Sequence, residues 1–97
     1  MPHYIAIIEE AGADTAVGIW FPDLPGCLSA GDTIDEALHN AEEALALYAE
    51  SEREEGRALP APRTLSELRK DPEAAKDIRD FIVALVPLPA GIADAAE

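Results

Sequence analysis

The side chains best suited to nucleophilic or metal chemistry in this chain are Cys27, His3 and His39, which are its single cysteine and its two histidines. A cysteine becomes a strong nucleophile when an electropositive neighbour, such as a histidine, stabilises the thiolate. No local signature links either histidine to Cys27. A zinc site needs several properly spaced histidine or cysteine ligands, which these scattered residues do not supply. We therefore predict no catalytic, metal or cofactor site, and we interpret Cys27 as a small buried apolar side chain.

Carboxylates are the abundant reactive group. The chain has 20 acidic and 7 basic residues and a net charge of −13. Such a charge repels nucleic acid and anionic lipid and favours a cationic partner. Most acids lie within residues 1–56, where Arg53 is the single basic residue, and the other bases lie between Arg57 and Arg79. An alternative interpretation is that the acidic surface only keeps the protein soluble.

Four apolar segments predict the strands of a sheet. His3–Glu9 is apolar on both faces, as expected for a central strand covered on both sides. Thr15–Phe21 and Cys27–Ala30 are expected to continue from it as an antiparallel meander. Phe81–Val86 is a short apolar run followed by prolines. Because a crossover precedes it, we expect it to enter the sheet beside the first strand and parallel to it.

A long amphipathic helix is predicted from Ile34 to Glu55. Thr33 followed by Glu36 forms a capping-box pattern, in which side chains satisfy two free N–H groups at the start of a helix. Apolar residues then recur at a spacing of four and three, which defines one buried stripe. The expected stripe consists of Ile34, Leu38, Ala41, Leu45 and Tyr48, widened by Ala37, Ala44 and Leu47.

Two short helices are predicted at Leu65–Lys70 and Pro72–Asp80. Thr64 and Glu67 form a second capping box, and Asp71 is a good cap before a proline at the first helical position. The expected fold class is α+β, with a three-stranded antiparallel meander, a fourth strand parallel to the first, and one long helix packed on the sheet.

The most distinctive motif is the run Trp20–Thr33, WFPDLPGCLSAGDT, which is stiffened by Pro22 and Pro25. Gly26 and Gly31 permit backbone geometry that other residues resist. The run is followed by the helix pattern EALHNAEEALALY and the stretch EGRALPAP. Together with the aliphatic first strand, these segments make the chain resemble the HicB family of antitoxins from bacterial toxin–antitoxin pairs.

The resemblance implies a partial ribonuclease H-like fold and a role in binding. It implies a type II antitoxin that neutralises a small, basic, HicA-like toxin that cleaves mRNA. The alternative is a stand-alone acidic, oligomeric interaction domain without a toxin partner. A neighbouring reading frame for a small, lysine-rich protein with a functional histidine would favour the antitoxin.

The ribonuclease H-like resemblance also raises a nuclease hypothesis. Active members of that fold hold two metal ions with clustered carboxylates, the first of which belongs inside the first strand. Here that strand has no acid before Glu9 and Glu10 at its end. We therefore expect that the chain is not an enzyme.

We predict that the partner-binding residues lie on the exposed side of the long helix and in the proline turn. Trp20 ends the second strand just before this turn and is either an anchor for a partner or part of the core. It shares a strand face with small Ala16 and Gly18, which leaves room for another subunit or for a helix. The candidate residues are Asp23, Asp35, Glu36, Glu42, Glu43 and Trp20.

Residues 1–86 are expected to form the HicB-like domain, and residues 87–97 a flexible C-terminal tail. Family members commonly carry a DNA-binding segment after this domain, but residues 87–97 contain no lysine or arginine. The chain is thus either naturally minimal or truncated before that segment, and we expect no direct nucleic-acid binding by the chain.

Two further expectations concern assembly and location. A small core and exposed sheet edges favour a homodimer or higher homo-oligomer. A single cysteine, no apparent signal segment and no apolar run of the ~20 residues that span a bilayer favour a cytoplasmic location without membrane contact.

Overall fold

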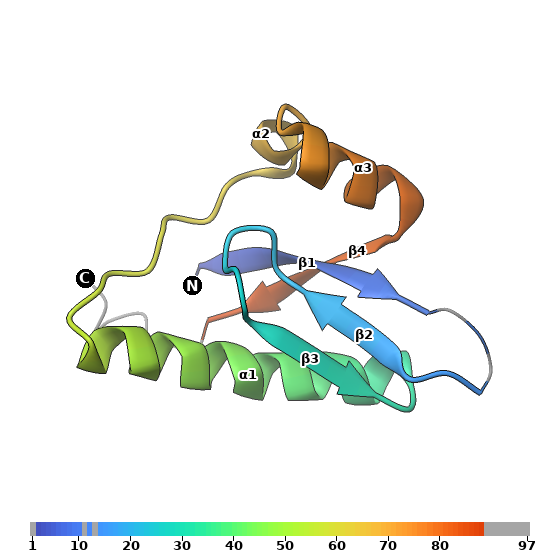
Figure 1. Ribbon diagram of the computed structural model, residues 1–97, viewed down its shortest axis with the longest axis horizontal. Helices are drawn as coiled ribbons and strands as arrows, with labels where there is room; N and C mark the ends of the chain where they lie inside the picture. The colour runs from blue at the N-terminus through green and yellow to red at the C-terminus, as the bar shows by residue number, and fades with distance from the viewer. Residues whose placement is uncertain (1, 11, 13, 89–97) are drawn as a thin grey trace.

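The computed structural model describes residues 2–10, 12 and 14–88 of the chain. The sequence predicts each of the observed strands and helices, and the observed ends differ from the predicted ends by a few residues. Within the described residues the elements, shown in Figure 1, are β1 (His3–Glu9), β2 (Val17–Trp20), β3 (Leu28–Gly31), α1 (Ile34–Glu54), α2 (Leu65–Leu68), α3 (Pro72–Asp80) and β4 (Ile82–Pro87).

The four strands form one sheet in the order β3-β2-β1-β4, and all neighbouring strands are antiparallel. The predicted meander of the first three strands is therefore confirmed, as is the position of β4 beside β1. The predicted direction of β4 is wrong. It runs antiparallel to β1, with His3 opposite Pro87 and Ile8 opposite Ile82.

The direction of β4 follows from the path between β3 and β4, which passes along the sheet twice. α1 runs back along one face, and the extended segment that follows it lies near the start of β1, where the Tyr4 hydroxyl donates to the Pro60 carbonyl. α2 and α3 then pass along the other face, and β4 begins at Ile82, opposite Ile8 near the end of β1. A single passage would have produced a parallel strand, but the second passage reverses it.

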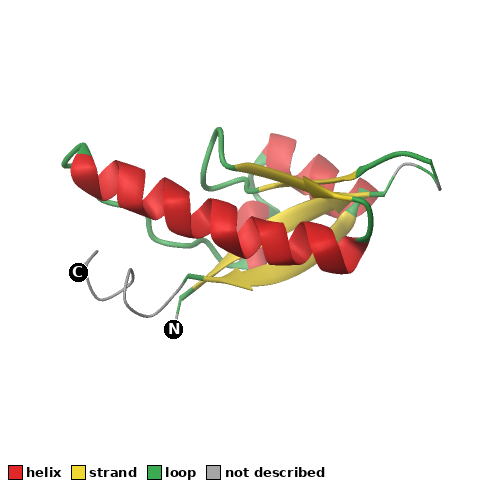
Figure 2. Cartoon of the chain, turned by 90° about the horizontal axis from the view of Figure 1, so that it is seen from below, coloured by secondary structure: helices red, strands yellow, loops and turns green. Residues whose placement is uncertain are grey.

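β1 is the centre of the fold because both of its faces are covered. The side chains from Tyr4 to Ile8 are all buried. α1 covers one face of the sheet, and α2 and α3 lie on the other (Figures 1 and 2). Ile5 packs in a small cluster with Leu68 and Ala74 from the short helices. The prediction of a central strand covered on both sides is confirmed.

α1 packs on the sheet through a narrow stripe of mostly small residues, namely Ala37, Ala41, Leu45 and Ala49. Most of the predicted stripe is either in this buried set or half-buried against the core. Leu47, which was expected to widen the buried stripe, is instead 67% exposed. The small alanines explain the difference, because they let the helix lie close to the sheet along one line, so that residues further round the helix stay outside.

Among the described residues, no helix is long and apolar enough to span a bilayer.

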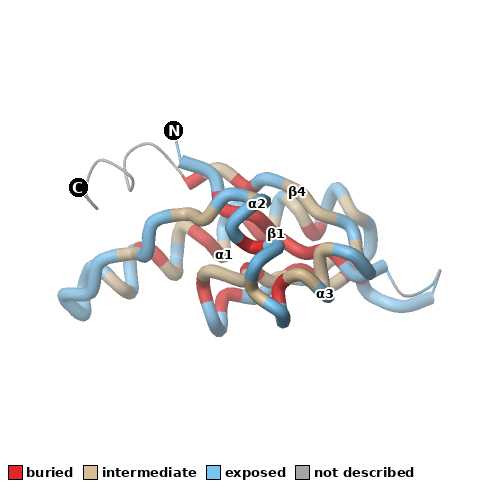
Figure 3. The backbone as a smooth tube through the Cα atoms, turned by 90° about the horizontal axis from the view of Figure 1, so that it is seen from above, coloured by how far each residue is buried: buried red, intermediate tan, exposed pale blue. Residues whose placement is uncertain are grey.

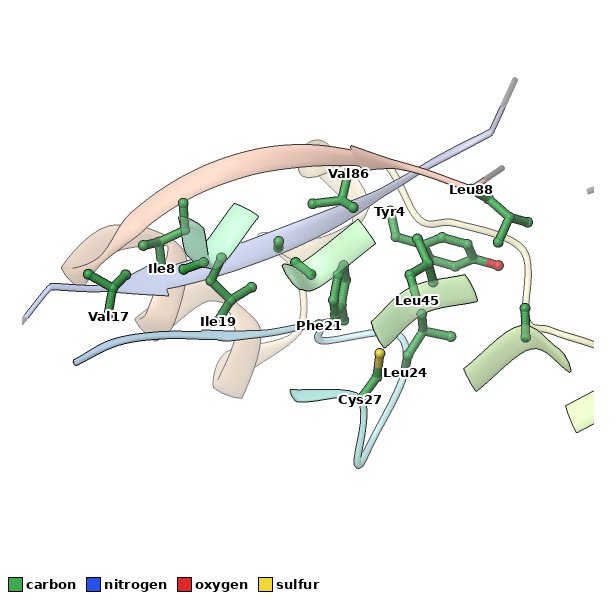
Figure 4. Close-up of a cluster of buried hydrophobic side chains, with 14 residues drawn as sticks. Tyr4, Ile8, Val17, Ile19, Phe21, Leu24, Cys27, Leu45, Val86 and Leu88 are labelled. Atoms are coloured by element: carbon green, nitrogen blue, oxygen red, sulfur yellow. The ribbon is translucent and has the colours of Figure 1, made fainter. Parts of the chain in front are cut away.

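The main core lies between α1 and the sheet, and Figure 4 shows its side chains pointing toward one another from β1, β2, β4, α1 and the turn after β2. The turn contributes Phe21, Leu24 and Cys27, all buried. Cys27 is thus a small apolar core residue, as predicted. Burial raises the pKa of its thiol to about 11, so it stays protonated at neutral pH.

Gly31 is required by the close approach of β3 and α1. A Cβ atom at this position would lie 2.5 Å from the backbone nitrogen of Ala37. Gly26 has a different role, because its φ of +87° is in the left-handed region that favours glycine. Gly31 therefore allows β3 and α1 to pack closely, and Gly26 allows the turn that precedes β3.

The C-terminal end of the described chain is part of the fold. Pro87 belongs to β4, and Leu88 is buried and donates its N–H to the Pro2 carbonyl at 2.9 Å. The sheet therefore includes the first residue of the expected tail, and a hydrogen bond holds the second beside it. The rest of that segment, residues 89–97, lies outside the described residues.

The burial of α1 predicts how two of its leucines differ. Leu45 is fully buried, whereas Leu47 is largely exposed. We expect Leu45→Ala to lower the free energy of unfolding by about 2–5 kcal/mol, because it leaves a cavity in the core. Leu47→Ala is the matched control and should change it by less than about 0.5 kcal/mol. Urea unfolding followed by circular dichroism measures both, and equal effects would contradict the assigned face.

Candidate partner-binding site

The exposed face of α1 carries the acidic residues Asp35, Glu36, Glu42 and Glu43, as the sequence predicts. Asp35 and Glu36 lie in the first turn, where the positive end of the helix dipole favours negative charge. Glu43 lies 3.4 Å from the His39 imidazole, one turn back on the same face. Both side chains are largely exposed, so this contact leaves the acidic surface accessible.

The start of α1 differs slightly from a standard capping box. The Thr33 hydroxyl accepts from the Glu36 N–H at 3.1 Å, as predicted. The Glu36 carboxylate accepts from the N–H of Asp32 at 3.1 Å, instead of from Thr33 itself. The side chain of Glu36 is therefore held toward the end of β3, and it is the most fixed of the four acids.

One side of α1 follows the outer edge of β3. The Asn40 amide donates to the Ala30 carbonyl at 2.9 Å, and the Ser29 hydroxyl donates to the Ala37 carbonyl at 3.0 Å. Residues three and four apart lie on the same side of a helix, so Glu43 and Leu47 continue the line begun by Glu36 and Asn40. We call the surface formed by Glu36, Asn40, Glu43 and Leu47 the β3-edge surface.

Asp23 has an intramolecular role. Its carboxylate accepts from the Arg63 backbone N–H at 2.8 Å and from the Arg63 Nε at 2.6 Å, and 6% of its side chain is exposed. This contact ties the turn after β2 to the extended segment before α2. Of the predicted partner-binding residues, Asp23 therefore has the least surface to offer, and its charge is already matched.

Arg63 also reaches the start of α3. Its Nη1 lies 3.3 Å from a carboxylate oxygen of Asp71, the N-cap of that helix. The Arg63 guanidinium and the N–H of Glu73 hold the pKa of Asp71 below its usual value of 3.8. One cation thus joins the turn, the connection and the second layer. The sequence gives no local sign of this, because Asp23 and Arg63 are 40 residues apart.

Trp20 is half-buried against α3, so a helix fills the space beside it on the strand. Its indole N–H lies 3.3 Å from an Asp77 carboxylate oxygen, and its ring packs edge-on against Phe81 with centroids 5.4 Å apart. It also lines a surface cavity of about 220 Å³ between the turn and α3. The helix that shares its strand face is thus the chain's own.

The same strand face stays open beyond Trp20. Gly18 and Ala30 are paired across β2 and β3, and Trp20 is opposite Leu28. No atom outside its neighbours lies within 4 Å of a Cβ built on Gly18, and Leu28 is 67% exposed. An apolar patch thus adjoins the β3-edge surface on the face that α1 does not cover.

The arrangement offers binding chemistry rather than bond-making chemistry. Among the described residues, no group of three or more histidine, cysteine or carboxylate side chains is placed to hold a metal ion. The middle of β1 is wholly apolar, and its first acid, Glu9, is at the exposed end. What the surface presents is exposed carboxylates and exposed leucines.

The comparisons with known proteins agree on one family. Residues 4–95 match the family model described as a HicB-like antitoxin of bacterial toxin-antitoxin systems. Antitoxin HicB 2 of Photorhabdus laumondii is 39% identical over 54 residues, which cover 56% of this chain and 39% of that protein. An uncharacterised 14.9 kDa protein of Haemophilus phage HP1 is 37% identical over 83 residues, which cover 86% of this chain and 58% of the phage protein. The chain therefore spans roughly half the length of these relatives.

Solved structures share the fold. The crystal structure of the Burkholderia pseudomallei antitoxin HicB matches 95% of this chain with a TM-score of 0.76 and 29% identity, and 67% of that antitoxin is covered. A chain in the HicA3 and HicB3 toxin-antitoxin complex matches 90% of this one with a TM-score of 0.68 and 30% identity, and 98% of it is covered.

The position of Asp23 predicts a structural phenotype. We expect Asp23→Ala to lower the free energy of unfolding by about 1–3 kcal/mol, because it removes the acceptor of two Arg63 hydrogen bonds. Glu43→Ala, which removes an exposed carboxylate, should change it by less than about 0.5 kcal/mol. Thermal and urea unfolding of the isolated variants are the measurements. An Asp23→Ala variant as stable as the parent would refute the anchoring role.

Proposed function

This chain belongs to the HicB-like antitoxin family of bacterial toxin-antitoxin systems, and on that premise we propose that it binds and neutralises a small, basic toxin of the HicA type that cleaves mRNA. The observation that carries the proposal is the match of residues 4–95 to the family model. The fold supports it, because the chain covers 98% of a chain that was solved in a HicA3 and HicB3 complex. Such a role needs a binding surface and no catalytic group.

We propose that the toxin docks on the acidic side of α1 and the adjoining β3-edge surface. A net charge of −13 attracts a basic protein from a distance, and Asp35, Glu36, Glu42 and Glu43 are exposed on one helix. The exposed Leu28 and Leu47 supply apolar contacts that charge alone does not.

The two remaining candidates enter the proposal differently. Asp23 is left out of the proposed contact surface because Arg63 already occupies its carboxylate. Trp20 contributes at most its exposed edge, beside Leu28, because α3 covers the rest of the ring.

We further propose that the protein is a homo-oligomer, is not an enzyme, acts in the cytoplasm and does not itself bind nucleic acid. The last point is supported by the excess of acid, which opposes contact with phosphates of any sequence. The bases that exist are partly used within the fold, since Arg57 pairs with Glu52 and Arg63 with Asp23. A stand-alone acidic interaction domain is the alternative to the antitoxin.

Co-expression separates the antitoxin from the stand-alone domain. We expect the chain to restore growth to cells that express the HicA-like protein encoded beside it, and the purified proteins to bind in calorimetry. Because charges contribute, Kd should rise as salt increases from about 50 to 500 mM. Continued toxicity together with no heat of binding would leave the stand-alone domain as the better account.

The docking surface has its own test with matched variants. Glu42→Gln with Glu43→Gln neutralises two adjacent glutamates on the proposed surface, and Glu54→Gln with Glu55→Gln neutralises two at the far end of the same helix. We expect the first pair to raise Kd for the toxin roughly tenfold, equivalent to about 1.4 kcal/mol, and to flatten its salt dependence. The second pair should have a much smaller effect. Equal effects of both pairs would mean that only total charge matters.

A further inference from the structure

The outer edge of β4 presents free backbone groups. Within the described residues, β4 is an outermost strand and pairs with β1 alone. The Leu88 N–H donates to Pro2, so the even-numbered residues of this strand direct their hydrogen-bonding groups toward β1. The N–H and C=O groups of Val83 and Leu85 therefore point away from the sheet. No hydrogen bond from the described residues reaches these groups.

The opposite edge of the sheet is partly blocked by α1. At β3, the Asn40 side chain from α1 takes the carbonyl of Ala30. Folded proteins commonly block a strand edge in this way, or place charges or prolines on it, because an open edge is a template for another strand. β4 contains no charged residue, and its one proline, Pro87, comes at its end. The fold therefore blocks a backbone group at the β3 edge and leaves those of Val83 and Leu85 free at the β4 edge.

The side chains around β4 add an apolar surface to this open edge. Leu85 is 64% exposed and Ile82 is 46% exposed. A groove of about 430 Å³ adjoins Leu85 on the face covered by α2, and Ile5, Pro62, Leu65 and Val83 are among the residues that line it. Figure 3 shows β4 at the side of the molecule, less buried than its neighbour β1.

We propose that β4 pairs antiparallel with β4 of a second copy of this chain, about a twofold axis at Leu85. The Leu85 N–H of each copy then donates to the Leu85 carbonyl of the other, and the Val83 N–H donates to the Pro87 carbonyl. The two exposed leucines meet on the same face, at the mouths of both grooves. The sheets of the two copies become one continuous sheet.

Charge favours a second copy over a basic partner at this edge. Two chains that each carry −13 repel each other wherever their acids meet, and an uncharged strand is where they can approach most closely. An uncharged strand offers a basic toxin no electrostatic attraction, and the toxin is drawn to the acids of α1. This inference specifies the interface of the proposed homo-oligomer, and antitoxin activity does not depend on it.

The test compares the two edges through leucines of similar exposure. Leu85→Lys should convert a dimer to a monomer in sedimentation equilibrium at micromolar concentration, because it places like charges at the axis. Leu28→Lys, at the opposite edge of the sheet, should leave the dimer intact. Circular dichroism checks that both variants are folded, which their exposure in the parent favours. A monomeric parent, or a Leu85→Lys variant that stays dimeric, would overturn the proposal.

A disulfide tests the position of the axis. In a hydrogen-bonded antiparallel pair the Cα atoms are about 5.5 Å apart, which a disulfide can bridge. Leu85→Cys should therefore form a covalent dimer under mild oxidation, and Leu28→Cys should not. Cys27 is buried and adds no background. Absence of the Leu85 cross-link would overturn the proposed pairing. Loss of toxin binding by Leu85→Lys, without a change in mass, would assign the edge to the toxin instead.

Discussion

The burial of β1 on both faces is the constraint on which the rest of this structure depends. Successive side chains of a strand point to opposite faces, so the buried run from Tyr4 to Ile8 requires a cover on each. Tyr4, Ala6 and Ile8 belong to the core under α1, and Ile5 belongs to the cluster under α2 and α3. Since each large aliphatic side chain contributes about 1.5–3 kcal/mol when buried, neither layer is dispensable in a domain of this size.

This constraint also explains the polar contacts that join distant parts of the chain. To cover the second face, the chain leaves α1 and passes the start of β1 in an extended segment that has no helical or strand hydrogen bonds of its own. That segment is held by side chains instead, with Tyr4 donating to Pro60 and Arg63 bound to Asp23. Arg63 then contacts Asp71 at the start of α3. One arginine thus links the turn of the first layer to the start of the second, beside the apolar packing of α2 and α3 on Ile5.

Local sequence patterns predicted the helices and strands of the fold. The features that they did not predict depend on contacts between residues far apart in the sequence. The apolar pattern of β1, the capping residues of α2 and α3, and the spacing in α1 each express a short-range rule, and each predicted its element. The direction of β4 depends on how many times the connection passes along the sheet, which no local pattern records. Asp23 was predicted as a partner contact because an acid in a turn shows no sign of an arginine 40 residues away. Trp20 stayed ambiguous for the same reason, since α3 reaches it from 57 residues further on.

The fold also separates the two kinds of surface that this acidic chain exposes. α1 packs its apolar stripe against the sheet, so its acids face outward. The first turns of this helix border β3. β4 has no charged residue of its own, so its open edge is neutral. These edges are separated by three strand spacings, or roughly 14 Å at about 4.8 Å each. That distance exceeds the Debye length of about 8 Å at physiological salt. Salt therefore largely screens the acids beside β3 from charges near β4. One chain can thus attract a basic partner at the β3 edge and pair with a second copy of itself at the β4 edge.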